Sequence, residues 1–284
     1  MVNGVFIVGN KRSGSTHLMK LLNIHPEIFV SNESDIMWIL YNYHNNKPLN
    51  FYPLDSPAGM KFSIEAAAQI LSKENTVQEN FYNFQTYLMK TGFISVPPMN
   101  KENLKYIGDQ KPYQNIDPEV LPFILEHFPN AKFIHLVRHP FEVISSSMKF
   151  MKDGSFLWKG KKPKEIFDKW VFHEQAVINA KEKYDLNIHQ VDYNGIISDA
   201  ENQMKKIFEF LEVSYSKEVL FECRFETAPN FKKMPIYPTT DAQLAMMKRF
   251  GYKSTFNYFE QTILPPVKQF WYKATFKLRR MLFH

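Results

Sequence analysis

Short apolar runs alternate with helical patterns along the first 215 residues or so. Val5–Val8 is a buried-strand pattern ended by Gly9, and the apolar spacing of Ser15–Leu22 predicts a helix. The same alternation continues as strands at 132–137 and 187–191 and helices at 121–127, 141–151, 164–184 and 200–211. Strands that alternate with helices predict an α/β fold of three layers, a central parallel sheet with helices on both faces.

The stretch 44–104 interrupts this alternation. Asn- and Pro-rich pieces flank two expected helices, near Ile64–Leu71 and Glu79–Met89. We interpret this stretch as a helical insertion over the sheet. Because no Ser/Gly-rich linker and no internal repeat divides the chain, we expect residues 1–284 to form a single domain.

Composition narrows the class of protein. The chain has 284 residues, 44% of them hydrophobic and 23% charged, which is globular and long enough for a sizeable core. The formal net charge is +6, but most of the excess lies in a tail without acids, so nucleic acid is not an expected partner. The tail cations are Lys268, Lys273, Lys277, Arg279 and Arg280. The lone Cys223 excludes an internal disulfide framework. With no signal-peptide pattern and no long apolar run, we expect a soluble, cytoplasmic protein.

The loop between the first strand and the first helix has the outline of a phosphate-binding loop. It reads GNKRSGST over residues 9–16, which matches G-x-x-x-x-G-K-[ST] except that Ser15 stands at the lysine position. Lys11 and Arg12 supply cations earlier in the loop, and backbone amides at a helix N-terminus favour an anion. The alternative is an ordinary strand–helix turn with basic surface residues.

A second cation follows the strand KFIHLV at 132–137. Arg138 stands where a nucleoside triphosphatase has an acidic residue that organises Mg²⁺. Ser146, about two helical turns further on, could offer a hydroxyl to the same anionic group. The alternative is that Arg138 pairs with a local carboxylate such as Glu142. A metal-dependent P-loop kinase is disfavoured, because it would need a lysine at Ser15 and an acid near Arg138.

Three motifs in this order resemble one family. KRSGST (11–16), QKP (110–112) and LVRHPFEVISSS (136–147) are similar to the sulfotransferase superfamily that uses 3′-phosphoadenosine 5′-phosphosulfate (PAPS), closest to its carbohydrate and protein-tyrosine branch. The resemblance runs from residue 4 to about 215. It implies a P-loop-like three-layer fold and an enzyme that transfers a sulfuryl group from PAPS to an acceptor hydroxyl, with 3′-phosphoadenosine 5′-phosphate (PAP) as the product.

The resemblance also implies how the donor is bound. The 5′-phosphosulfate would lie in the loop, with Arg12 as its main cation, and Arg138 and Ser146 would hold the 3′-phosphate. Tyr193, which follows a strand, would lie near the adenine; its alternative role is a core aromatic. The loop residues assigned to the donor are Lys11, Arg12, Ser13, Gly14, Ser15 and Thr16.

The same resemblance implies a base. Glu33, in the run VSNE, matches the position of a glutamate base in the carbohydrate/tyrosyl branch, where it would take the acceptor's proton. Its alternative role is an acid at the N-terminus of a helix capped by Asn32 or Ser31. The rival bases are His17, His135 and His139.

Lys111 resembles the lysine that stabilises charge on the transferring group and the bridging oxygen. Its alternative role is a solvated turn lysine. Because a sulfuryl group carries less negative charge than a terminal phosphoryl, Arg12 and Lys111 could replace Mg²⁺, and no metal is expected. The catalytic set is therefore Glu33, Lys111 and Arg12.

The acceptor is not readable from the motifs. The branch suggests a carbohydrate or a glycolipid, with 44–104 on the acceptor side, and other sugars or small alcohols stay open. The basic tail 264–284 has helical apolar spacing, so 266–284 either touches a membrane surface peripherally or packs on protein. Lys232 and Lys233 are candidates, by position alone, to close over the nucleotide. A non-catalytic nucleotide-binding protein is the remaining alternative.

Overall fold

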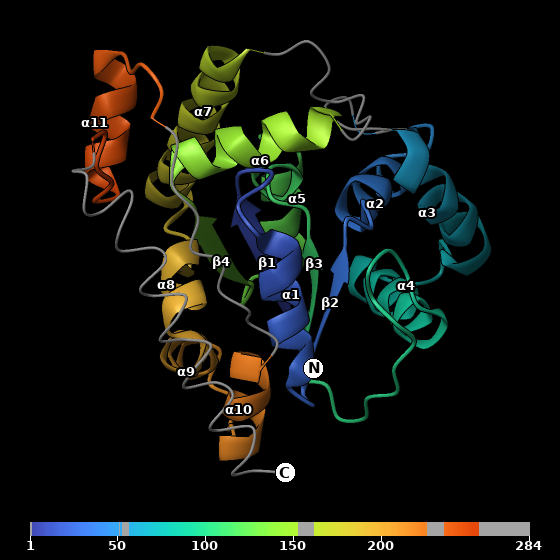
Figure 1. The fold of residues 1–284 in the computed structure, drawn as a ribbon. Helices are drawn as coiled ribbons and strands as arrows, with labels where there is room; N and C mark the ends of the chain where they lie inside the picture. Colours follow the sequence, from blue (N-terminus) through green and yellow to red (C-terminus); the bar gives the residue numbers. More distant parts are fainter. Residues whose placement is uncertain (1, 51, 53–56, 153–161, 226–235, 256–284) are drawn as a thin grey trace.

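The computed structural model describes residues 2–50, 52, 57–152, 162–225 and 236–255. Its centre is a five-stranded, fully parallel sheet in the order β2-β3-β1-β4-β5 (Figure 1). The strands are β1 (Asn3–Gly9), β2 (Ile28–Asn32), β3 (Tyr106–Gln110), β4 (Lys132–Val137) and β5 (Ile188–Asp192). The α/β class predicted from the alternating pattern is confirmed.

The strand order reverses direction at β1. β3 lies on one side of β1 and β4 on the other, so the connections leave β1 towards opposite edges of the sheet. In open parallel sheets, the crevice at the carboxyl ends of strands beside such a switch point is where ligands bind. The loop after β1, predicted to bind an anion, therefore begins at this crevice.

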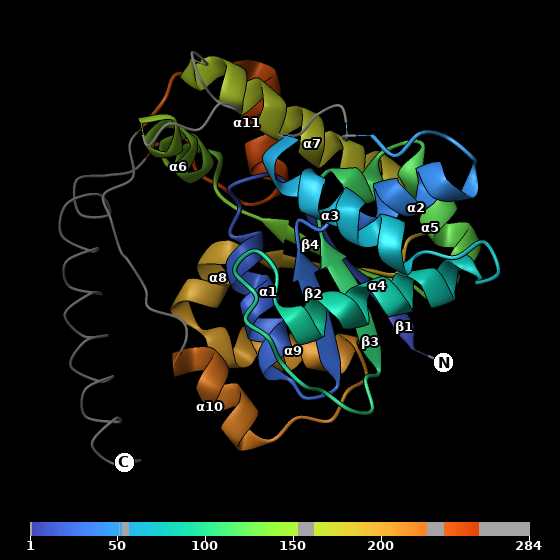
Figure 2. The same cartoon turned by 90° about the vertical axis from the view of Figure 1, so that its right-hand side faces the viewer.

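Helices cover both faces of the sheet. One side of the strands is covered by α1 (Ser15–Ile24), α8 (Tyr193–Ser198), α9 (Ala200–Phe210) and α10 (Lys217–Phe225). The other side is covered by α4 (Val77–Thr91) and α5 (Val120–His127) (Figure 2). On that second side Phe6 of β1 packs against Phe81 of α4 and Phe128 after α5. The remaining helices of the described residues are α2 (Ile36–His44), α3 (Pro57–Ile70), η1 (Gln114–Ile116), α6 (Pro140–Lys152), α7 (Pro163–Tyr184) and α11 (Asp241–Arg249).

The insertion contains the two helices expected in it, and both are longer than predicted. α3 begins at Pro57, and α4 begins behind Thr76, whose hydroxyl accepts the Glu79 amide in a capping box. α4 packs on α2 and on β2, so the insertion flanks the β2 edge of the sheet. Asn32, the last residue of β2, joins it by donating from Nδ2 to the Ile94 carbonyl (3.0 Å).

Several expectations fall on residues that the structure does not describe. The tail 264–284, Lys232 and Lys233 all lie outside the described residues. Within the described part, no helix combines the length and the apolarity needed to cross a membrane.

Candidate functional site

The loop from Gly9 to Gly14 requires glycine at both ends. Gly9 has φ 131°, and a Cβ there would lie 2.5 Å from the Leu136 carbonyl oxygen of the neighbouring strand. Gly14 has φ 99°, and a Cβ there would lie 2.1 Å from the Tyr193 ring. Gly14 is also the N-cap of α1, so it brings the first amides of that helix up to the ring. The loop conformation therefore depends on these two glycines. We call the loop 9–14 together with the start of α1 and the Tyr193 ring the cradle.

A buried polar network connects the loop to α7 and β4. Asn10 Nδ2 donates to Glu174 Oε1 of α7 (2.6 Å), and Asn10 Oδ1 accepts from Nδ1 of His173 (2.9 Å). His135 on β4 is 2.7 Å from the other oxygen of Glu174, so this rival base is engaged in the network. Ser13 closes the turn by donating to the Asn10 carbonyl (2.6 Å). Sequence reasoning missed Glu174 and His173, because nothing in a helical stretch signals such distant partners.

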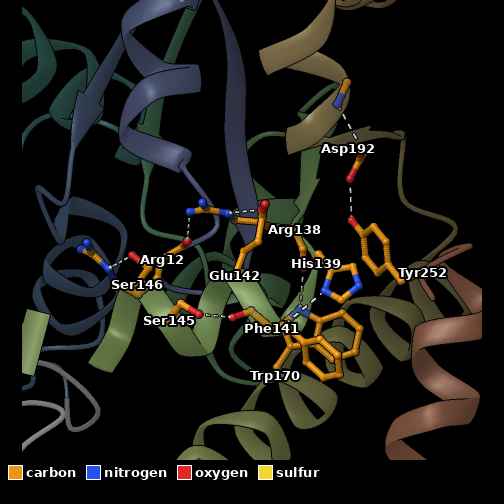
Figure 3. Close-up of polar contacts among 11 residues, drawn as sticks. Arg12, Arg138, His139, Phe141, Glu142, Ser145, Ser146, Trp170, Asp192 and Tyr252 are labelled. Atoms are coloured by element: carbon orange, nitrogen blue, oxygen red, sulfur yellow. Dashed lines mark hydrogen bonds and ion pairs between the residues drawn. The ribbon is translucent and has the colours of Figure 1, made fainter. Parts of the chain in front are cut away.

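Two arginines meet at the carboxyl ends of β1 and β4. Arg138 Nη1 donates to the Arg12 carbonyl (3.1 Å), and Arg12 Nε donates to the Ser146 hydroxyl (3.3 Å; Figure 3). Burial lowers the pKa of Arg12, the positive charge of Arg138 lowers it further, and the Glu33 carboxylate partly offsets both effects. Two like charges held together in this way are stabilised by a bound anion.

The partners of these arginines differ in detail from the roles expected. Arg138 Nε pairs with Glu142 Oε2 at 2.9 Å, which is the alternative partner considered from the sequence. Ser146, expected beside Arg138, is instead bound by Arg12. Both side chains of the Arg138–Glu142 pair are partly exposed, at 21% and 26%, so an incoming phosphate can reach the guanidinium.

Tyr193 forms one wall of the cradle. It begins α8 directly after β5, and its half-buried ring lies against Gly14. The Arg138 guanidinium lies over the ring, 4.5 Å from its centroid, and His17 meets it edge-on at 6.2 Å. This ring therefore connects the loop to the second arginine.

Glu33 lies where β2 ends. Its amide donates to the Gln110 carbonyl of β3 (3.0 Å), and its φ of 51° turns the chain into the left-handed region. The N-cap of α2 is Asp35, whose side chain makes no capping hydrogen bond; the Ile36 amide donates instead to the Ser34 hydroxyl (3.4 Å), so capping by Asn32 or Ser31 is not observed. Glu33 is partly exposed and close enough to Arg12 to act on its pKa.

Lys111 is buried, so its alternative role as a solvated turn lysine is wrong. Its Nζ lies 2.9 Å from Asp35 Oδ1, and the two side chains are 5% and 1% exposed. Gln114 Nε2 donates to the same oxygen (2.8 Å). Asp35 is a member of the site that sequence reasoning missed.

The other loop residues bind neighbouring strands. The Ser15 hydroxyl, at the usual lysine position, accepts from Gln110 Nε2 of β3. Thr16 Oγ1 donates to Asn32 Oδ1 (3.3 Å). The side chain of Lys11 is partly exposed on the loop. The loop, the end of β2 and the end of β3 are thus joined by side-chain contacts.

The rival base His139 has a structural role. Its Nε2 donates to the Lys253 carbonyl (2.9 Å) and its Nδ1 accepts from the Phe141 amide (3.2 Å; Figure 3). Burial lowers its pKa to about 4. His17, beside Tyr193, is the rival that lies at the cradle. Among the described residues, no three His, Cys, Asp or Glu side chains gather as a metal site.

Comparison with known proteins identifies the class of protein. Residues 4–217 match the sulfotransferase family, and the chain therefore belongs to this family of sulfuryl-transferring enzymes. Among solved structures, the sulfotransferase domain from the curacin biosynthetic pathway is similar with a TM-score of 0.60 and 18% identity, over 90% of this chain and 99% of that one. The sulfotransferase domain of the Synechococcus PCC 7002 olefin synthase is similar with a TM-score of 0.58 and 19% identity, over 89% and 96%.

One curated relative is an uncharacterised protein of Aquifex aeolicus (strain VF5), 25% identical over 227 residues. The match covers 76% of this chain but 26% of that protein, so the chain spans about a quarter of the relative's length. The family match therefore carries the assignment, and the two solved structures show the fold.

Proposed function

We propose that this protein transfers a sulfuryl group from PAPS to an acceptor hydroxyl, at the carboxyl ends of β1, β3 and β4. The observation that carries the proposal is the convergence of Arg12, Arg138 and Tyr193 around Gly14. A glycine at a helix N-terminus, two guanidinium groups and an aromatic ring suit a nucleotide that bears anionic groups on both sides of its ribose.

The residues present fit the donor. The loop residues Lys11, Arg12, Ser13, Gly14, Ser15 and Thr16 would hold the 5′-phosphosulfate, through the amides at the start of α1 and with the Arg12 guanidinium as the main cation. Arg138 would exchange its contact with Glu142 for the 3′-phosphate, and Ser146 would bind the same group. Tyr193 would pack near the adenine. A Cβ at position 14 would clash with the Tyr193 ring, so glycine at this position is what allows the ring to pack against the loop.

The proposed chemistry is an in-line transfer. PAPS supplies a sulfuryl group joined to phosphate through a bridging oxygen. Glu33 takes the acceptor's hydroxyl proton as the acceptor oxygen bonds to sulfur, and the electrons of the broken sulfur–oxygen bond stay on PAP. Arg12 and Lys111 stabilise charge on the sulfuryl oxygens and the leaving phosphate. The ammonium of Lys111 has three N–H donors, so its pairing with Asp35 is compatible with this role.

We propose that the transfer needs no metal ion, because the fixed cations Arg12, Lys111 and Arg138 supply positive charge at the site. Turnover measured with EDTA should equal turnover measured with added Mg²⁺. A rate that disappears with EDTA and returns with Mg²⁺ would contradict this part of the proposal.

For the acceptor we propose a carbohydrate or a glycolipid. The support is the glutamate at the end of β2, which resembles the base of the carbohydrate/tyrosyl branch, and the insertion 44–104 beside it. Asn32, next to Glu33, contacts Ile94 of that insertion. A pooled screen of sugars, glycolipids, tyrosyl peptides and small alcohols with labelled PAPS would identify the acceptor class.

The cellular location is also a proposal. We infer a cytoplasmic protein whose basic segment 266–284 either packs on protein or touches the inner membrane surface peripherally. Deletion of 266–284 should abolish co-sedimentation with anionic liposomes if that contact exists. Unchanged co-sedimentation would favour packing of the segment on protein.

A thermal-shift comparison tests the donor assignment directly. PAP should raise the melting temperature, because the site proposed here binds a 3′-phosphate. ATP with Mg²⁺ should not raise it, since that ligand would suit a P-loop kinase site instead. A larger shift with ATP and Mg²⁺ would overturn the proposal. Binding of PAP without turnover against any pooled acceptor would favour the non-catalytic alternative.

A further inference from the structure

Glu33 lies in a conformation that its own side chain does not favour. Residues 33 and 35 both have left-handed backbones, with φ of 51° and 57°, although neither is glycine. A left-handed residue with a Cβ costs roughly 1–2 kcal/mol. Such strain persists only where the surrounding structure holds it. The contacts on both sides of Glu33 therefore decide where its carboxylate lies.

A buried carboxylate binds both sides of this turn. Asp109 of β3 is fully buried, and its Oδ1 accepts from the hydroxyls of Ser31 and Ser34, each at 2.8 Å. The Ser34 amide lies 3.4 Å from the same oxygen. Ser31 precedes Glu33 by two residues and Ser34 follows it directly, so one oxygen ties the chain before and after the turn.

The sheet register makes this arrangement possible. β2 and β3 are parallel, with Ser31 opposite Asp109 and Asn32 opposite Gln110. The ladder continues to the Glu33 amide, which donates to the Gln110 carbonyl, and ends there. The left-handed turn thus begins where the last backbone contact of β2 is made, and Ser34 is the next residue held.

We propose that Asp109 is a positioning residue for Glu33: by binding Ser31 and Ser34, it holds the left-handed turn that keeps the Glu33 carboxylate beside Arg12. This inference rests on the proposed role of Glu33 as the base. Asp109 is fully buried and acts on Glu33 through the two serines. Its carboxylate is also close enough to Lys111 to interact with that ammonium electrostatically, so the serine variants, which leave Asp109 in place, are the primary test. We name the Asp109–Ser31–Ser34 contacts the β3 clamp.

The first test is the double variant Ser31→Ala/Ser34→Ala, which removes both hydroxyls and leaves Asp109 in place. In its crystal structure φ of Glu33 should leave the left-handed region, and an unchanged backbone at residue 33 would overturn the proposal. Ser147→Ala is the matched control, because this buried serine has no hydrogen-bond partner among the described residues. Residue 33 should keep its conformation in the control.

The second test follows PAP release from PAPS in the presence of pooled acceptor alcohols. A misplaced base is expected to cost about 100-fold in kcat, with the PAP dissociation constant unchanged. Asp109→Asn keeps an accepting oxygen and should retain most of the activity that Asp109→Ala loses. A wild-type kcat for Ser31→Ala/Ser34→Ala, or an equal loss of PAP binding, would overturn the proposal.

A double-mutant cycle separates positioning from general stability. In a Glu33→Gln background the serine substitutions should cause no further loss of kcat, because the group they position is already absent. A fully additive loss would show that the β3 clamp acts elsewhere. If Glu33→Gln alone keeps full activity, the base assignment fails, and the crystal structure still decides whether the clamp holds the turn.

Discussion

Lys111 Nζ lies 2.9 Å from Asp35 Oδ1, and both side chains are buried. They lie at the carboxyl ends of the strands, where the phosphate-binding loop of residues 9–16 also begins. The two residues come from different segments, the end of β3 and the turn before α2. Removing one partner of a buried ion pair deprives the other charge of its nearest counter-charge, which costs about 3–5 kcal/mol. The pair therefore couples the candidate active site to the stability of the fold.

We expect Lys111→Met and Asp35→Asn each to lower the free energy of unfolding, measured by urea denaturation. The double variant should regain part of the loss, because neither charge is then left alone. Lys111→Met should also lower kcat by about 100- to 1000-fold, and the double variant should not recover it. Strictly additive stability losses would contradict a direct pair.

Glu33→Gln should lower kcat by about 100-fold or more, while calorimetry should give unchanged PAP affinity. The Gln side chain keeps the size of Glu33 but accepts no proton from the acceptor. The control is Glu209→Gln, an exposed residue of α9 with no role in the site. A wild-type rate for Glu33→Gln would remove Glu33 from the chemistry and leave His17 as the rival base.

The left-handed backbone of Glu33 predicts an unusual stability order. Glu33→Gly should be more stable than Glu33→Ala by about 1 kcal/mol, because glycine tolerates φ of 51°. At Lys205, an exposed position inside α9, the order should reverse, since glycine weakens a helix relative to alanine. The same order at both positions, measured by urea denaturation, would contradict a strained Glu33.

Arg138→Ala should weaken PAP binding and reduce the preference for PAP over adenosine 5′-monophosphate, which lacks the 3′-phosphate. Loss of a hydrogen bond to a charged group corresponds to about 10- to 100-fold in affinity. Glu142→Gln should have the opposite effect, because it removes the negative charge that competes with the phosphate for Arg138 at 2.9 Å. Calorimetry with both nucleotides measures the preference.

Arg249→Ala is the control for that measurement, since Arg249 is exposed and pairs with Glu182 on the surface. It should leave both affinities unchanged. An undiminished preference for PAP in Arg138→Ala would contradict the assignment of the 3′-phosphate.

Two histidines, the buried His139 and the partly buried His173, predict acid sensitivity. Burial lowers the pKa of His139 to about 4 and, with the charges of Lys169 and Lys11, that of His173 to about 3. In the unfolded chain the pKa of a histidine is about 6.5. Between these values only the unfolded state binds the protons, so stability falls as the pH drops from about 6.5 towards 4. The slope is at most about 1.4 kcal/mol per pH unit for each group.

Urea denaturation at several pH values checks this slope. In the His139→Asn variant the free energy of unfolding should depend less steeply on pH than in the wild type, because one of the two titrating histidines is removed. A slope unaffected by that substitution, or histidine proton resonances that titrate near the unfolded value, would contradict the burial of a neutral His139.

Local patterns in the sequence are sufficient for much of the fold. The strand at 132–137 and the helix starting at Ser15 follow directly from apolar periodicity and from Gly9 and Gly14, because these signals depend on neighbouring residues alone. The placement of Arg138 at the end of β4 follows in the same way. Helices α10 and α11 were not predicted, because each is short and offers too few turns for a clear helical periodicity of apolar residues.

The sequence by itself determined the α/β class, the phosphate-binding loop of residues 9–16 and the positions of Arg12 and Arg138 after their strands, since each depends on a contiguous segment of the chain. Only the tertiary structure decided which side chains pair there. Asp109 meets Ser34 across 75 positions and Asn10 meets Glu174 across 164, and these meetings depend on strand register and helix packing. A buried charge must find a partner, and which partner it finds is a property of the folded chain.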